Sequence, residues 1–263
     1  MDLLTAEEIR AGLGTTFIGR NLLYLPETGS TNDEAKRLAR KGAVEGTLVI
    51  ADYQTDGRGR LDRRWVAPPG SSLLMSLVFR PRLAPHQVQR LTMICGLGLA
   101  DAVESETELR IGLKWPNDLV ANGAKIGGIL TEVELLKGHV EYAVVGIGLN
   151  VNLDRDELPS DLLVPATSLS LALGRPVPRL VLLQLFLRNL ESRVVALASG
   201  LSPHEEWAER LSTLGQAVTV STFHRVFSGV AEGVDADGAL QIRLPNGRLE
   251  TVLAGDVTLR CPQ

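Results

Sequence analysis

The sequence has few of the residues that build disulfide frameworks and metal sites. Its 263 residues include two cysteines, at positions 95 and 261, and four scattered histidines. No CxxC spacing occurs, so neither a zinc site nor a disulfide framework is expected. Cys95 lies in an apolar stretch, where a buried free thiol is the usual arrangement. We therefore expect no metal held by protein side chains.

Membrane-spanning and secretory segments are also missing. No apolar run reaches the roughly 20 residues that cross a bilayer, and Met1–Arg10 is too polar for a signal peptide. A cytoplasmic protein is expected. The formal net charge of −4 argues against a general nucleic-acid binder, which needs a basic face. With 44% hydrophobic and 22% charged residues, the chain supports one large globular domain, or one with a small appendage.

The segment Gly57–Trp65 gathers cationic charge in this acidic chain. It holds four arginines and two glycines in nine residues. Glycines let backbone amides approach closely, and guanidinium groups bind phosphate oxygens bidentately. No P-loop sequence is present, and Gly57-x-Gly59 lacks the third glycine of a dinucleotide fingerprint. A solvated basic loop is the alternative. Its charges repel one another without a ligand, so we expect a mobile loop that wraps a small anion.

Periodicity and turn residues predict helices alternating with strands. Thr5 and Glu8 have the spacing of a capping box. Asn122-Gly123 is a strong hairpin signal, and Lys137-Gly138 is a second turn. We expect helices over 33–40, 85–105, 180–197 and 203–211, and strands over 21–25, 46–52, 71–80, 112–120, 125–136 and 140–152. This order predicts an α+β fold in which a mixed, mostly antiparallel sheet packs with helices.

Near Gly215 the pattern changes to short strands separated by turn residues. Five are expected, over 217–221, 229–234, 239–244, 248–253 and 257–260. Their number and spacing predict a small C-terminal β-barrel. We place the boundary between Ser212 and Gly215, which gives a larger domain over residues 1–213 and a smaller one over 214–263.

Three further segments carry candidate binding residues. Lys114–Asp118 brings a cation, an amide and a carboxylate within five residues, as a phosphate site with metal or ribose requires; an edge-strand anchor followed by a turn is the alternative. Lys125 precedes the pair Gly127-Gly128, which indicates a bulge or a close approach by a ligand, although Lys125 alone fits a solubilising charge. Gly146–Asn152 repeats the pattern, with small residues followed by asparagines.

The segment Ser30-Thr31-Asn32 opens a predicted helix. Thr31 and Glu34 have capping-box spacing, so a helix N-cap accounts for the hydroxyl groups. The N-terminus of a helix also suits a polar ligand, so a structural and a binding role are compatible.

Together these segments resemble the biotin protein ligases. The most specific signature of that family, Gly-Arg-Gly-Arg-x-x-Arg-x-Trp, is present as Gly57–Trp65. In the family's order it is accompanied by Ser30-Thr31-Asn32, Lys114–Asp118, Lys125–Leu130 and Gly146–Asn150. The resemblance covers nearly the whole chain. It implies the biotin/lipoyl ligase catalytic fold followed by an SH3-like domain.

The resemblance implies three groups of site residues. Arg58, Lys114 and Lys125 are the candidate catalytic residues. The biotin-binding set comprises Ser30, Thr31, Asn32, Gln54, Gly57, Arg58, Gly59, Arg60, Lys125, Gly127, Gly128, Gly146 and Gly148, whose glycines let the bicyclic ring of biotin lie flush. The ATP-binding set comprises Arg60, Arg63, Trp65, Lys114, Asn117, Asp118, Asn150 and Arg260, and Asp256 is expected to close over the nucleotide.

Two features depart from the pattern. Asp62 stands where many members have glycine, and it could pair with Arg60 or Arg64. Only about 20 residues precede the first catalytic strand, too few for the N-terminal DNA-binding domain that makes some members repressors. No repressor activity and no nucleic-acid partner are therefore expected. The residues do not decide oligomeric state, and the resemblance allows a homodimer.

The implied reaction joins biotin to ATP, as its Mg²⁺ complex, to give biotinyl-5′-AMP and pyrophosphate. A lysine of a biotin carboxyl carrier protein then takes the biotinyl group. Two alternatives stay open: a lipoate or octanoate ligase of the same fold, and a non-catalytic biotin sensor or carrier-binding module.

Overall fold

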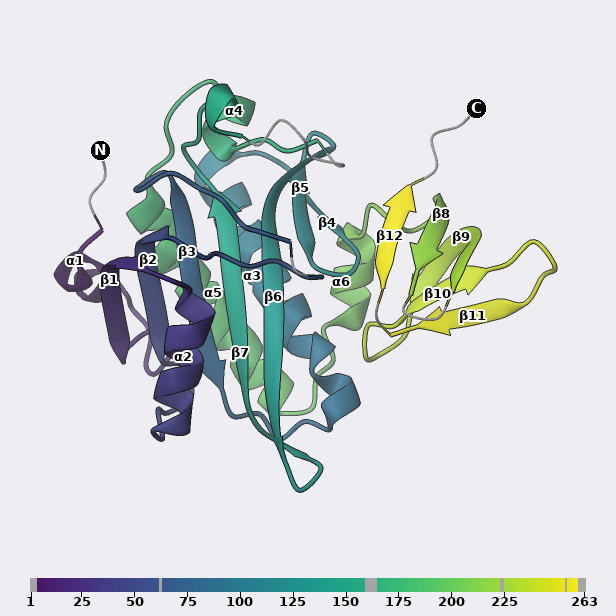
Figure 1. Ribbon diagram of the computed structural model, residues 1–263, viewed down its shortest axis with the longest axis horizontal. Helices are drawn as coiled ribbons and strands as arrows, with labels where there is room; N and C mark the ends of the chain where they lie inside the picture. The colour runs from purple at the N-terminus through teal and green to yellow at the C-terminus, as the bar shows by residue number, and fades with distance from the viewer. Residues whose placement is uncertain (1–3, 62, 159–164, 223–224, 254, 260–263) are drawn as a thin grey trace.

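The larger part of the molecule is a seven-stranded sheet with strand order β1-β2-β3-β7-β6-β5-β4 (Figure 1). The computed structural model describes residues 4–61, 63–158, 165–222, 225–253 and 255–259. The strands are β1 (Leu22–Thr28), β2 (Leu48–Gln54), β3 (Ser72–Phe79), β4 (Ile111–Lys114), β5 (Asp118–Ala121), β6 (Ala124–Leu136) and β7 (His139–Asn150). β1 and β2 are parallel, and the other neighbours are antiparallel. The predicted mixed, mostly antiparallel sheet is confirmed.

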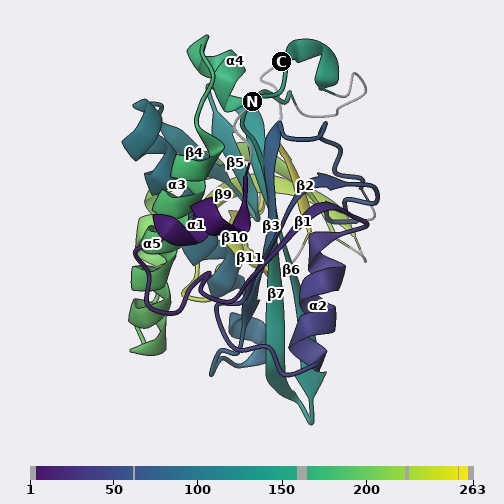
Figure 2. The ribbon, with the colours of Figure 1, turned by 90° about the vertical axis from the view of Figure 1, so that its left-hand side faces the viewer.

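Helices cover both faces of this sheet (Figure 2). α3 (Gln89–Thr107) and α5 (Arg179–Ala198) pack on one face over the main apolar core, and α2 (Thr31–Arg40) covers the other face. All eight residues of β3 are buried as a consequence. α1 (Ala6–Ala11) begins at Thr5, whose hydroxyl accepts a hydrogen bond from the amide of Glu8, as the capping box predicts. None of the described helices is long and apolar enough to cross a membrane.

The turns follow the sequence signals with one correction. Asn122 and Gly123 have φ values of 50° and 78° and join β5 to β6, and Lys137-Gly138 joins β6 to β7. The single strand expected over 112–120 is wrong: the chain turns back at Trp115–Asn117 and forms β4 and β5 as an antiparallel pair. The turn contains a cis peptide bond between Trp115 and Pro116. It therefore presents Asn117 at an end of the sheet.

A five-stranded antiparallel sheet forms the C-terminal part, with order β11-β10-β9-β8-β12. Its strands are β8 (Ala217–Ser221), β9 (Val226–Val234), β10 (Leu240–Arg243), β11 (Leu249–Val252) and β12 (Asp256–Leu259). The predicted small C-terminal part built of five short strands is confirmed, and within the described ranges no pairing joins β11 to β12. α6 (His204–Arg210) leads from α5 to this sheet, and three other short elements lie within the larger part: η1 (Pro85–Gln87) before α3, and η2 (Arg155–Glu157) and α4 (Leu169–Leu173) between β7 and α5.

The C-terminal sheet is fastened to the larger part through the turn between β9 and β10. The indole Nε1 of Trp115 donates to the carbonyl of Gly238 over 2.9 Å. Arg90 on α3 forms an ion pair with Asp237, with 2.7 Å between nitrogen and oxygen. Buried residues of the C-terminal strands belong to the same apolar cluster as α3 and α5. The C-terminal sheet therefore has a fixed position beside the arginine-rich loop between β2 and β3.

Candidate active site

A cavity of about 730 Å³ lies where the arginine-rich loop crosses the end of the sheet. Its walls come from the start of α2, the end of β2, the turn between β4 and β5, the strands β6 and β7, and the start of β12. Most of the predicted site residues line it: Ser30, Thr31, Asn32, Gln54, Arg58, Gly59, Arg60, Arg63, Trp65, Lys114, Asn117, Asp118, Lys125, Gly128, Gly146, Gly148, Asn150 and Asp256. Gly57 and Gly127 are not among the lining residues, and Arg260 and Asp62 lie outside the described residues.

The arginine-rich loop folds as a tight hairpin. The amide of Gly59 donates to the carbonyl of Arg63 over 2.7 Å, and the amide of Trp65 donates to the carbonyl of Gly57 over 2.8 Å. A Cβ atom at Gly57 would collide with the carbonyl oxygen of Trp65. This glycine is therefore required by the hairpin itself.

Carboxylates from other elements pair with the cations of the loop. Arg58 forms a bidentate pair with Asp33 at the start of α2, with distances of 2.9 and 2.5 Å. Arg63 pairs with Asp256 of β12. The hydrogen bond from Arg58 holds the pKa of the Asp33 carboxyl below its ordinary value. The mutual repulsion expected from the sequence is thus offset by resident anions.

Arg60 is held differently. It donates to the side-chain oxygen of Asn117 over 3.2 Å and to the carbonyl of Gly255 over 3.0 Å. Burial lowers the pKa of its guanidinium below the ordinary value. Arg60 therefore meets neutral acceptors from the β4–β5 turn and from the C-terminal sheet, in a site that favours an additional negative charge.

The segment Ser30-Thr31-Asn32 does not cap α2 as predicted. The helix begins at Thr31, and the hydroxyl of Ser30 makes no capping hydrogen bond. The amide and hydroxyl of Thr31 both donate to Oε1 of Gln54, over 2.7 and 2.9 Å. The hydroxyl is drawn to this neighbouring strand, so the predicted capping box is wrong.

Two residues that sequence reasoning missed support this side of the cavity through Asn32, although they are not among its lining residues. The hydroxyl of Ser76 on β3 lies 2.6 Å from Oδ1 of Asn32. The carboxylate of Glu132 on β6 accepts from Nδ2 of Asn32 over 2.7 Å. The amide nitrogen of Asn32 donates and its amide oxygen accepts, so Glu132 fixes which end of the Asn32 amide faces β6. A serine in the middle of an apolar strand was the available signal for Ser76.

The glycines of β6 and β7 make room for side chains of this protein. A Cβ atom at Gly146 would lie 2.8 Å from Cγ of Asn32, and one at Gly148 would lie 2.7 Å from Cζ2 of Trp65. One at Gly128 would lie 3.3 Å from Nζ of Lys125. The binding of biotin against these glycines stays a prediction, and the structure adds that they seat Asn32 and Trp65.

Trp65 and Lys125 both line the cavity and meet beside Gly128. Nζ of Lys125 lies 5.8 Å from the centroid of the Trp65 ring and 2.5 Å from the carboxylate of Asp118. The indole nitrogen of Trp65 is buried and has no hydrogen-bond partner within the described part of the chain. A buried donor of this kind is costly unless it is paired, so it suits an acceptor supplied by a ligand.

The other wall is built from the β4–β5 turn and the end of β7. Nδ2 of Asn117 donates to the carbonyl of Ile129 over 2.7 Å, which fixes the turn against β6. Nδ2 of Asn150 donates to the carbonyl of Thr167 over 3.1 Å. Lys114 lies at the end of β4 and lines the cavity with them. No cluster of three or more His, Cys, Asp or Glu side chains able to hold a metal occurs among the described residues.

Family comparison divides the chain into two matched segments. A model described as the biotin/lipoate A/B protein ligase family matches residues 24–150. A second, described as the biotin protein ligase C-terminal domain, matches residues 213–260. The first match includes both sides of the cavity, and the second includes β8 to β12.

Curated proteins and solved structures agree with these matches. The bifunctional ligase/repressor BirA of Bacillus spizizenii is 35% identical over 97% of this chain and 79% of its own length. The biotin–[acetyl-CoA-carboxylase] ligase of Mycobacterium tuberculosis is 35% identical, over 90% of this chain and 88% of its own. A biotin protein ligase from Aquifex aeolicus, solved with biotin and ATP, superposes with a TM-score of 0.75 at 30% identity, covering 92% of this chain and 99% of that one.

Proposed function

Since the chain belongs to the biotin/lipoate A/B protein ligase family, we propose that it is an ATP-dependent biotin protein ligase. It activates biotin to biotinyl-5′-AMP with release of pyrophosphate and then transfers the biotinyl group to a carrier lysine. The observation that carries this proposal is a single cavity with neutral hydrogen-bonding groups on one wall and cations on the others. Biotin has a neutral ring system and an anionic carboxylate, and ATP is a polyanion, so the two kinds of wall match the two substrates.

The neutral wall is the proposed site of the biotin ring. Thr31, Asn32 and Gln54 present donors and acceptors whose orientations are set by their mutual bonds and by Ser76. A ureido group offers two N–H donors and one carbonyl acceptor, which this set can satisfy. The match to a C-terminal domain described for biotin protein ligases favours biotin over lipoate.

The cationic residues are proposed to bring the two anionic substrates together. Lys125 lines the same cavity as both walls, and the carboxylate of biotin is expected to approach the α-phosphate beside it. Arg58 and Lys114 flank the cavity, and Arg60 and Arg63 reach it from the loop. Fixed positive groups of this kind stabilise the charge that develops on the α-phosphoryl oxygens, so catalysis depends on positioning and electrostatics. The carboxylate attacks phosphorus, and pyrophosphate leaves.

ATP is expected to enter as its magnesium complex. Mg²⁺ prefers oxygen ligands and keeps several waters when it accompanies nucleotide phosphates. Among the described residues that line the cavity, the carboxylates are those of Asp118 and Asp256, each already paired with a cation. They fit an ion held mainly by the phosphates, where it would offset their charge.

The second step needs a carrier lysine and protection from water. The mixed anhydride is hydrolysed in bulk solvent, so a covering loop preserves it. Arg60 and Arg63 fasten the hairpin to the C-terminal sheet through Gly255 and Asp256 and so hold it over the cavity. The acceptor amine then attacks the acyl carbon, and AMP leaves. A biotin carboxyl carrier domain of acetyl-CoA carboxylase is the proposed acceptor, in keeping with the name of the mycobacterial relative.

The test is exchange of labelled pyrophosphate into ATP. Exchange that requires biotin, and that lipoate and octanoate do not support, is the expected result. Transfer of labelled biotin to a carrier domain should require ATP. Exchange with lipoate in place of biotin would assign the chain to the lipoate branch of the family, and tight biotin binding without exchange would identify a sensor.

A further inference from the structure

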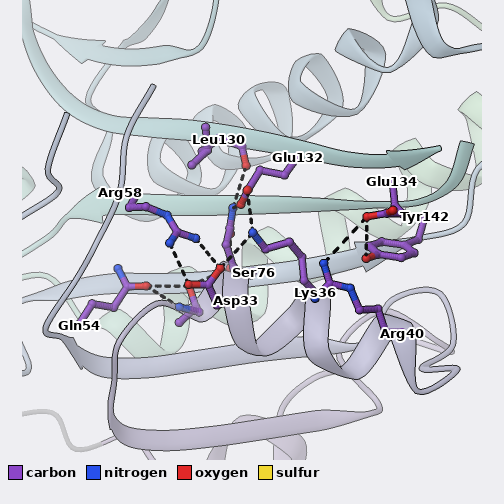
Figure 3. A network of polar contacts seen from close by, with 12 residues as sticks. Asp33, Lys36, Arg40, Gln54, Arg58, Ser76, Leu130, Glu132, Glu134 and Tyr142 are labelled. Carbon is purple, nitrogen blue, oxygen red and sulfur yellow. Dashed lines mark hydrogen bonds and ion pairs between the residues drawn. The ribbon is translucent and has the colours of Figure 1, made fainter. Parts of the chain in front are cut away.

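We propose that Asp33 is a positioning residue that helps the protein to keep biotinyl-5′-AMP bound. It holds the guanidinium of Arg58 in place beside the neutral wall of the cavity. The inference rests on the proposed function. It concerns a carboxylate that does not line the cavity and that the sequence motifs do not single out. It begins from the polar network drawn in Figure 3, where Arg58 of the loop reaches down to the first turn of α2.

The pair is bidentate. Nη1 and Nη2 of Arg58 donate to the two oxygens of Asp33 over 2.9 and 2.5 Å. Parallel bonds of this type fix the plane of the guanidinium as well as its position. They engage two of its five N–H donors, so Arg58 can contact a ligand anion while it stays attached to α2.

Asp33 is in turn held by the sheet. Nζ of Lys36 lies 3.0 Å from Asp33 and 2.8 Å from Glu132 of β6. The other oxygen of Glu132 accepts from Asn32 over 2.7 Å. Charges alternate along this series from Arg58 through Asp33 and Lys36 to Glu132 (Figure 3). Arg58 is therefore connected, through Asp33 and Lys36 of α2, to β6, which lines the cavity.

Electrostatics and geometry predict opposite effects for the loss of this carboxylate. Asp33 places a negative charge beside a cavity that takes anionic substrates. Removing it should strengthen adenylate binding if only the charge matters. If Asp33 acts by holding Arg58, the same change loosens the guanidinium, and the adenylate should escape faster. The sign of the effect distinguishes the two.

The experiment measures release of labelled biotinyl-5′-AMP from preformed complexes in a chase assay. Asp33→Asn keeps the side-chain shape and removes the charge, and about fivefold faster release is expected, the upper range for a half-exposed ion pair. Glu34→Gln is the matched control, because Glu34 stands in the same helical turn but pairs with Arg37 on the surface. Its release rate should equal that of the wild type. Asp33→Glu should restore part of the retention.

A double substitution separates positioning from general support of the fold. In an Arg58→Ala background, Asp33→Asn should change release no further, because the partner that it positions is gone. Unchanged or slower release from Asp33→Asn alone, or an equal effect in both backgrounds, would overturn the proposal. Wild-type protein that forms no biotinyl-5′-AMP would instead refute the proposed function, so the two failures are distinguishable.

Discussion

Gly146 offers the sharpest test of how the neutral wall is built. A Cβ atom there would overlap Oδ1 of Asn32 and would lie 2.8 Å from its Cγ and 3.0 Å from its Nδ2. Normal Cβ contacts are longer than 3.0 Å, so in Gly146→Ala the Asn32 amide has to move by about an ångström. It then loses its contacts with Ser76 and Glu132, which are 2.6 and 2.7 Å long.

The size of the effect follows from these two hydrogen bonds. A neutral hydrogen bond contributes about 1 kcal/mol, and one to a charged group somewhat more, so the oriented Asn32 amide is worth about 2 kcal/mol. We expect biotin affinity, measured by calorimetry, to fall about 30-fold in Gly146→Ala. Affinity for a non-hydrolysable ATP analogue should not change. Gly29→Ala is the control, because a Cβ atom at Gly29 meets nothing within 4 Å.

A second background makes the reasoning refutable. In Asn32→Ala the clash disappears, so adding Gly146→Ala should weaken biotin binding no further. If Gly146→Ala lowers affinity equally in both backgrounds, the methyl group acts on biotin directly. Gly146 would then serve the ligand and not the seating of Asn32.

Three further outcomes are expected. Lys125→Ala should slow biotin-dependent pyrophosphate exchange by about 10²-fold through loss of one oxyanion donor, whereas the distant Lys41→Ala should not. Glu191→Gln should lower the free energy of unfolding by about 1 kcal/mol at pH 7, because the Glu191 carboxylate accepts the amides of Thr16, Phe17 and Ile18. Burial opposes ionisation there, but these bonds outweigh it and hold the pKa of Glu191 below its ordinary value of 4.5, so the difference from wild type in urea unfolding should shrink as the pH falls from 4.5 and vanish once the pH has passed through the lowered pKa. Gly96→Ala should raise stability by about 0.5 to 1 kcal/mol, since its Cβ atom would make ordinary contacts of 3.5 Å or more within α3.

The fold could be predicted from the sequence at positions where a local pattern is compatible with one structure. Asn122-Gly123 fits a tight hairpin and formed one. The failure at 112–120 has a physical reason as well, since a four-residue strand on each side of a Trp-Pro turn has the same apolar pattern as one longer strand. Periodicity cannot show that the chain reverses, and only the pairing of Leu113 with Leu119 does.

The residues that line the cavity could be predicted from the sequence, but most of the residues that hold them in place could not. Lys114, Lys125 and Trp65 stand in conspicuous motifs and do line one cavity. Asp33 and Glu132 lie in α2 and β6, where the charged residues of the sequence look like ordinary solvent-exposed side chains. Their role depends on the approach of α2 to β6, which joins residues about 100 positions apart. No pattern within either segment specifies that approach.

The same supports explain how a chain of net charge −4 keeps a cationic cavity when no ligand is bound. Arg58, Arg63 and Lys125 each have a carboxylate partner, from α2, β12 and β5 respectively. Three different elements thus contribute the anions. The pairs of Arg58 and Arg63 join the loop to α2 and to the C-terminal sheet, whereas the pair of Lys125 lies between the neighbouring strands β6 and β5. Binding of biotin and ATP adds negative charge to groups that are already paired, so the substrates must share these cations or displace their partners. Pairs that can share, such as bidentate Arg58–Asp33, keep the loop in place while the ligand binds. The ammonium group of Lys125 has three N–H donors and no fixed plane, so it can bond a ligand beside Asp118 without being held in one orientation, and that difference assigns positioning to the first and direct charge stabilisation to the second.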